Sequence, residues 1–195
     1  NFVSQKVSQV TKIGNMIVNR NRYIDQLSRS KGNGLIKIIT GLRRSGKSFL
    51  LKKLFCQHLL DGGVREDHIL VIDMENRKNK EFKNPDHLLD WVEKMMVDDD
   101  TYYIIIDEVQ EVDDFVEVLS SLSVTDGTDV YVTGSNSRFL SSDVVTEFRG
   151  RGDEIHVWPL SFKEFMSVYD GSKEDGWAEY RLYGGLPQLL TQIGD

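Results

Sequence analysis

The residues from Gly41 to Ser48 have the types and spacing of a phosphate-binding loop. They read GLRRSGKS, in which two glycines separated by four residues are followed directly by lysine and serine. Such glycines let backbone N–H groups curl around a polyphosphate, the lysine reaches the outer phosphates, and the serine hydroxyl ligates Mg²⁺. The sequence therefore predicts a site for a nucleotide with Mg²⁺, built by Gly41, Leu42, Arg43, Arg44, Ser45, Gly46, Lys47, Ser48 and Phe49.

Two adjacent acids, Asp107 and Glu108, form a second group that could do chemistry. They end the run YYIIIDE, whose apolar residues are typical of a strand buried on both faces of a parallel sheet. The carboxyl ends of such strands present the ligand-binding groups of open α/β sheets. In a nucleotide hydrolase, the first acid holds the Mg²⁺ shell and the second orients and deprotonates the attacking water. We thus expect Ser48 and Asp107 to ligate the metal, Glu108 to act as the general base and Lys47 to neutralise γ-phosphate charge.

Strands and helices must alternate along the chain to bring these two groups together. Short apolar runs indicate strands at 35–39, 69–72, 102–106, 130–132 and 155–157. An apolar helical face follows the loop, and Pro85 predicts the start of another helix. Along the sequence, one strand and two helices separate the strand at 35–39, which leads into the loop, from the strand at 102–106, which leads to the two acids. This order predicts that another strand lies between these two strands in the sheet. The expected fold is an α/β P-loop NTPase, a three-layer αβα sandwich with about five parallel strands.

Composition places the chain among globular proteins. Its 195 residues are 39% hydrophobic and 28% charged, which suits one α/β domain with a sizeable core. No apolar stretch approaches the roughly 20 residues that cross a bilayer, so we expect no membrane partner. The single cysteine, Cys56, lies on the apolar helix after the loop and is expected to be a buried hydrophobic residue. These features predict a cytoplasmic protein in a reducing compartment.

The net charge of −7 is unevenly distributed along the chain. Residues 1–60 hold 12 of the 24 lysines and arginines but only one of the 31 acids, so this part carries +11 and the remainder −18. A basic segment can follow the phosphates of a nucleic acid, or it can face the acidic part of the same fold, and both interpretations stay open. The run Asp98–Asp100 and four histidines without metal-ligand spacing are better explained as solvated or structural residues than as a cation site.

Five segments taken together resemble the prokaryotic AAA-like ATPases of the AAA domain 14 type. They are GLRRSGKS, YIIIDEVQ, VTGSNS, FRGRGDEIHVWPLSFKEF and YGGLPQLL, in the same order and at similar spacings. The likeness spans about Val18 to Leu190. The paired arginines inside the loop and the runs TGSNS and PLSFKEF are more specific than a phosphate loop alone.

The resemblance implies an ATPase core over 20–160, preceded by an N-terminal segment, 1–19, and followed by a partial helical lid, 161–195. It also implies that Ser135 or Asn136 contacts the γ-phosphate. An arginine, Arg151 in preference to Arg149, would reach the nucleotide of a neighbouring subunit. That role implies that the chain self-associates. A plain polar turn at Ser135 and Asn136 and two solvated arginines at Arg149 and Arg151 are the alternatives, and both stay open. The family's usual C-terminal domain, of poorly defined role, would be missing because the chain stops at Asp195.

These observations predict Mg²⁺-dependent binding of ATP and its hydrolysis to ADP and phosphate. Glu108 favours hydrolysis over the main alternative, a nucleotide-gated switch that binds ATP tightly and turns over slowly. A second alternative is a DNA-associated motor subunit, supported only by the basic N-terminal part of the chain. We also expect Lys47 to be solvated when the site is empty, so that replacing it would abolish binding without unfolding the protein.

Overall fold

A five-stranded parallel sheet forms the centre of the computed structural model, which describes residues 17–134, 148 and 150–187. Its strands are β1 (Ile36–Thr40), β2 (Ile69–Asp73), β3 (Tyr102–Asp107), β4 (Thr128–Thr133) and β5 (Gly152–His156). They lie in the order β2-β3-β4-β1-β5, and every neighbouring pair is parallel. Since β4 lies between the strand that leads into the loop and the strand that ends in the acids, the predicted intervening strand is confirmed.

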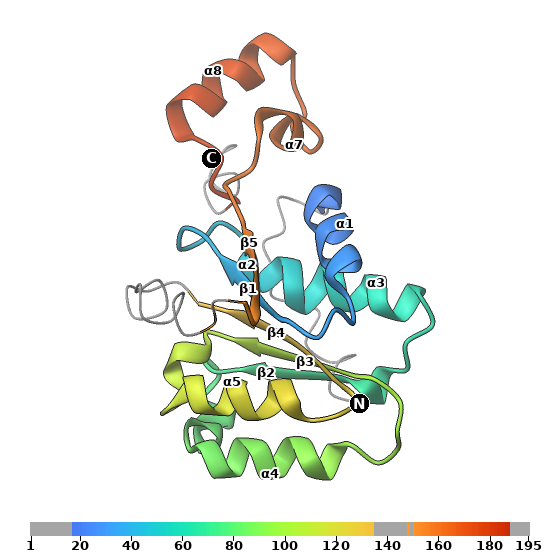
Figure 1. Ribbon diagram of the computed structural model, residues 1–195. Helices are drawn as coiled ribbons and strands as arrows, with labels where there is room; N and C mark the ends of the chain where they lie inside the picture. Colours follow the sequence, from blue (N-terminus) through green and yellow to red (C-terminus); the bar gives the residue numbers. More distant parts are fainter. Residues whose placement is uncertain (1–16, 135–147, 149, 188–195) are drawn as a thin grey trace.

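Helices cover both faces of the sheet and make it the middle of three layers (Figure 1). One face packs against α1 (Asn21–Ser30) and the helix that follows the loop, and the other against α4 (Pro85–Met95) and α5 (Phe115–Val124). Successive residues of β3 alternate between the two apolar clusters, so the whole strand is buried. The predicted αβα sandwich is therefore confirmed, and Pro85 begins α4 with Asn84 as its cap.

The helix after the loop is continuous but changes its winding. It begins as α2 (Lys47–Phe49), widens to π-helical turns over Leu50–Phe55 and ends as α3 (Cys56–Asp61). Its apolar face packs on the sheet, and Cys56 is buried as expected. Short 3₁₀ helices join other elements at Glu66–His68, Arg77–Lys83 and Val109–Glu111.

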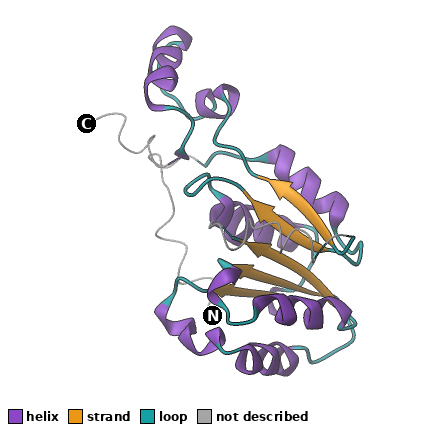
Figure 2. Cartoon of the chain, turned by 60° about the vertical axis from the view of Figure 1, so that its left-hand side comes forward, coloured by secondary structure: helices purple, strands orange, loops and turns teal. Residues whose placement is uncertain are grey.

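Two helices near the C-terminal end of the described chain stand out from the sheet (Figure 2). These are α7 (Phe162–Met166) and α8 (Lys173–Tyr183), which pack together through an apolar cluster of their own. A capping box formed by Ser161 and Glu164 begins α7. Across the described residues, we find no helix with the length and apolar character needed to span a membrane.

The fifth strand begins earlier than its apolar residues suggest. The sequence indicated a strand at 155–157, whereas β5 starts at Gly152, opposite Ile36 of β1. As an edge strand, β5 pairs with a neighbour on one side only, so it accommodates the polar residues Asp153 and Glu154. Pairing with β1, rather than local hydrophobicity, sets where this strand begins.

Candidate functional site

The predicted phosphate-binding loop, Gly41 to Ser48, is called the glycine-rich loop from here on. It lies where β1 ends and α2 begins, at the carboxyl ends of the parallel strands. Gly41 has a φ of +135°, and a Cβ at this position would lie 2.2 Å from the carbonyl oxygen of Val157. Gly46 has a φ of +97° at the start of the helix. Only glycine satisfies both backbone positions without strain. The loop exposes the side chains of Leu42, Arg43 and Arg44.

Lys47 is buried in this structure, with 4% of its surface exposed. Its Nζ donates to the carbonyl oxygens of Gly41, over 3.0 Å, and Leu42, over 3.1 Å. Burial lowers the pKa of Lys47, and the charges of Glu108 and Asp107 oppose that shift. The expectation of a solvated lysine is therefore wrong, because the carbonyl groups of its own loop provide hydrogen-bond acceptors within reach.

Asp107 is the centre of a hydrogen-bonded group that joins the loop helix to two strands. Its Oδ1 accepts from Ser48 Oγ over 2.8 Å and from Thr133 Oγ1 over 2.6 Å. The carboxylate is 1% exposed. The two predicted metal ligands are therefore in direct contact, and a hydroxyl with a carboxylate is the hard oxygen set that suits Mg²⁺. The residues at this edge of the sheet fit that ion.

Glu108 follows Asp107 with a left-handed backbone, φ +57°. Its N–H donates to Thr133 Oγ1 over 2.9 Å, and its Oε2 accepts from Gln110 Nε2 over 2.5 Å. Glu108 is therefore held through its backbone by Thr133 of β4 and through its side chain by Gln110. Sequence reasoning missed Thr133 and Gln110, although both stand in segments that it singled out.

A lysine and a third acid complete the group around Asp107. Lys52 Nζ lies 2.6 Å from Asp107 Oδ2 and 2.9 Å from Asp73 Oδ2. Burial lowers the pKa of Lys52, but its hydrogen bond and charge interaction with Asp107 outweigh burial and raise it overall. Sequence reasoning missed both residues. The available signals were the position of Lys52 four residues after Ser48 and that of Asp73 at a strand end.

Arg20 connects the loop to the C-terminal helices. Its Nη1 donates to the carbonyl of Ser45 over 3.2 Å, and its Nη2 donates to the carbonyl of Trp158 over 2.7 Å. Its Nε lies 2.9 Å from Glu164 Oε1 at the start of α7. The side chain is 4% exposed. No local pattern indicates this role, because all three partners are distant in the sequence.

Part of the uneven charge distribution has an internal explanation. Arg20, Lys37 and Lys52 belong to the basic first 60 residues, and each forms an ion pair with an acid from the later, acidic part of the chain. Lys37 is fully buried against Asp129. These pairs support the interpretation in which the basic part faces the acidic part of the same fold.

Arg151, the one further predicted residue that the structure describes, does not join this group. Arg151 is exposed and directly precedes β5. The first residue of β5 pairs with the start of β1, so Arg151 lies at the amino ends of the strands, whereas the loop lies at their carboxyl ends. It cannot contact the loop of its own chain from there. Ser135, Asn136 and Arg149 lie outside the described residues.

A cavity of about 540 Å³ borders Glu108. The segment after β2, including Arg77 and Lys80, lines it together with Glu108 and Gln110. Gln110 Oε1 is buried and has no hydrogen-bond partner among the described residues. No residue of the glycine-rich loop lines the cavity, so it is a space beside the expected base and not the phosphate site itself.

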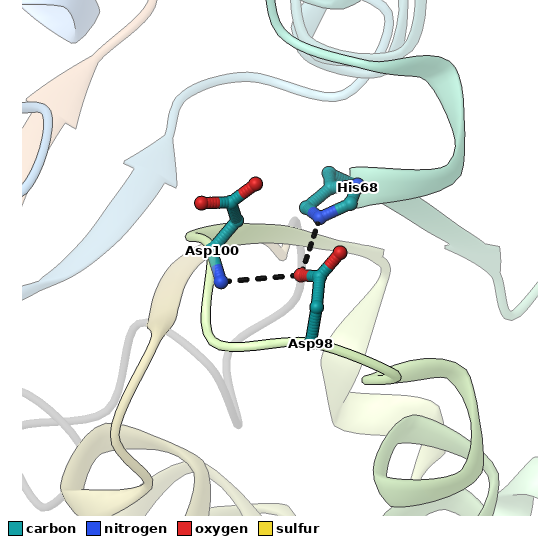
Figure 3. A group of neighbouring side chains, drawn as sticks. All are labelled: His68, Asp98 and Asp100. Carbon is teal, nitrogen blue, oxygen red and sulfur yellow. Dashed lines mark hydrogen bonds and ion pairs between the residues drawn. The ribbon is translucent and has the colours of Figure 1, made fainter.

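A histidine and two aspartates lie close together before the amino ends of β2 and β3, at the end of the strands opposite the glycine-rich loop (Figure 3). Atoms of His68, Asp98 and Asp100 lie within 4.8 Å of one another. Arg65 Nη2 already lies 2.6 Å from Asp98 Oδ2, and both ring nitrogens of His68 bond to carboxylates, those of Asp67 and Asp98. Burial opposes a charge on His68, but these hydrogen bonds outweigh it and raise its pKa. The group is therefore explained as a surface ion-pair network around a buried, structural histidine.

Known proteins match this chain in sequence and fold. The model of the AAA domain family of type 14 matches residues 33–166. An uncharacterized protein of Haemophilus influenzae is 33% identical over 180 residues, which are 89% of this chain and 45% of that protein. An uncharacterized protein of Methanocaldococcus jannaschii is 27% identical over 172 residues, which are 82% of this chain and 37% of that protein. The chain thus spans less than half the length of these relatives.

A solved structure supports the fold. The structure of PCH-2 from Caenorhabditis elegans superposes with a TM-score of 0.51 and 21% sequence identity, covering 75% of this chain and 44% of PCH-2. At this level of identity the likeness concerns the arrangement of strands and helices alone.

Proposed function

Because the chain belongs to the AAA domain family, we propose that it binds ATP with Mg²⁺ and hydrolyses it to ADP and phosphate. The observation that carries the proposal is the 2.8 Å contact between Ser48 and Asp107, which unites the two predicted metal ligands at the end of the glycine-rich loop. Glu108 follows Asp107 directly and borders the cavity beside this contact. Bound Mg²⁺ would neutralise the charge that develops on the β- and γ-phosphates.

Each residue of the group has a separate task in this proposal. Loop N–H groups between Gly41 and Ser48 hold the phosphates, and Lys47 exchanges its two carbonyl partners for γ-phosphate oxygens. Glu108 accepts the proton of the attacking water. Ser135 or Asn136 would contact the γ-phosphate.

Arg151 is proposed to act between subunits. Its exposure at the sheet edge opposite the loop suits contact with the nucleotide of a second copy of the chain. Such an arginine stabilises the charge of the transition state and makes hydrolysis depend on assembly. Turnover per chain should therefore rise with protein concentration.

A slow-turnover switch is the second candidate function. The observation that favours it is the 2.5 Å hydrogen bond by which Gln110 holds Glu108, since a carboxylate oxygen engaged in this way is not available to orient an attacking water. Tight ATP binding with little phosphate release would support this alternative.

Phosphate release by the purified chain tests the proposal. ATP turnover is measured with Mg²⁺, with EDTA and with added duplex DNA, and Lys47→Ala serves as the inactive control. Turnover that needs both Mg²⁺ and Lys47 is the expected result. Stimulation by DNA would favour a DNA-associated motor, and absence of ATP binding by calorimetry would refute the proposed function.

A further inference from the structure

Lys52 places a positive charge directly against the expected metal ligand Asp107. Its Nζ is 2.6 Å from Asp107 Oδ2. The other carboxylate oxygen, Oδ1, accepts hydrogen bonds from the hydroxyl groups of Ser48 and Thr133. The two hydroxyls and the ammonium together fix the orientation of a carboxylate that is 1% exposed.

Three elements converge to hold Lys52 in this place. The residue lies one helical turn after Ser48, so the two side chains leave the same face of the loop helix. Asp73 and Asp107 are register partners on the neighbouring strands β2 and β3. Two carboxylates this close repel each other, and the ammonium between them, 2.9 Å from Asp73 Oδ2, offsets that repulsion.

We propose that Lys52, anchored by Asp73, is a positioning residue that makes metal binding at Asp107 depend on nucleotide. The inference rests on the proposed function, because it takes Ser48 and Asp107 as the Mg²⁺ ligands. A divalent cation that arrives alone meets an ammonium of like charge. A cation that arrives with a nucleotide is accompanied by a polyphosphate, whose negative charge outweighs the single charge of Lys52.

Mn²⁺ binding to the nucleotide-free protein tests this role without any catalysis. Free Mn²⁺ is followed by electron paramagnetic resonance for the wild type, Lys52→Met and the control Lys31→Met, which removes the same charge at the opposite edge of the sheet. Lys52→Met should bind Mn²⁺ about tenfold more tightly or better, because the buried carboxylate of Asp107 and the partly buried one of Asp73 lose their counter-ion. Lys31→Met should match the wild type.

Two further variants identify where the metal binds. Adding Asp107→Asn to Lys52→Met should remove the gain in Mn²⁺ affinity, and adding Asp73→Asn should reduce it. Should Lys52→Met fail to fold by circular dichroism, Lys52→Gln provides the same loss of charge with a polar side chain.

An unchanged Mn²⁺ affinity in a folded Lys52 variant would overturn the inference, since a purely structural ion pair would alter thermal stability alone. ATP turnover plays no part in this assay. A protein that fails to bind ATP but shows the Lys52-dependent change would therefore refute the proposed function and leave the charge effect standing. An active ATPase with unchanged Mn²⁺ affinity would refute only the role of Lys52.

Discussion

Replacing Lys37 with methionine should destabilise the fold strongly, because it leaves a carboxylate buried without its counter-ion. Lys37 is fully buried in β1, the strand that leads into the glycine-rich loop, and forms an ion pair with Asp129, which is 3% exposed. Once the ammonium is gone, Asp129 Oδ2 keeps the hydroxyl of Tyr131 at 2.9 Å and the N–H of Gly32 at 3.0 Å, but Oδ1 loses its cation. Breaking one side of such a pair costs about 3 to 5 kcal/mol.

Urea unfolding followed by tryptophan fluorescence measures this cost. A loss of about 3 kcal/mol corresponds to a fall in Tm of roughly 6 to 12 °C for a chain of this size. The exposed Lys31→Met is the matched control and should stay within about 0.5 kcal/mol of the wild type. The double variant Lys37→Met with Asp129→Asn should lose less than the sum of the single losses. A loss below about 1 kcal/mol for Lys37→Met, or strict additivity in the double variant, would refute the reasoning.

Three further predictions concern the loop and the ion-pair network. Gly41→Ala should lower the free energy of unfolding, measured by chemical denaturation, by about 2 to 4 kcal/mol, because the added Cβ would lie 2.2 Å from the carbonyl oxygen of Val157. The control Gly63→Ala, whose added Cβ meets open space, should lower it by about 1 kcal/mol. Lys47→Ala should abolish ATP binding in calorimetry and also lower Tm, since the lysine is buried on two loop carbonyls. The pKa of His68 is raised on folding, so its charge stabilises the protein below the unfolded pKa of about 6.5, and that contribution is lost as pH rises through the folded pKa. His68→Gln should therefore lower Tm more at about pH 6 than at about pH 9, and an equal loss at both would contradict the shift.

The sequence sufficed for the parts of the site that follow local rules. The spacing from Gly41 to Ser48 and the apolar run before Asp107 each describe one continuous segment, and strand alternation then predicts that their ends meet at one edge of a parallel sheet. The contact between Ser48 and Asp107 agrees with that prediction.

The partners of these residues depend on tertiary structure and could not be predicted in the same way. Lys52 reaches Asp107 only because the π-helical segment packs on the face of the sheet that β2 and β3 share. Arg20 reads as an ordinary polar residue before a helix, yet its partners lie as far along the chain as Glu164. Lys47 is buried because it bonds to carbonyl groups of the loop itself, an option that residue types do not reveal.

Single-turnover hydrolysis by Glu108→Gln tests the central claim most directly. The amide keeps the shape of the side chain and can hold a water molecule, but it cannot accept the proton, so ATP binding should persist while the rate on the enzyme falls by about a hundredfold to ten-thousandfold. Asp107→Asn is the comparison. It should weaken Mg²⁺ binding, so that added Mg²⁺ raises the affinity for ATP less than it does in the wild type. The account predicts that Glu108→Gln retains bound ATP, and hydrolysis of that ATP at the wild-type rate would contradict it.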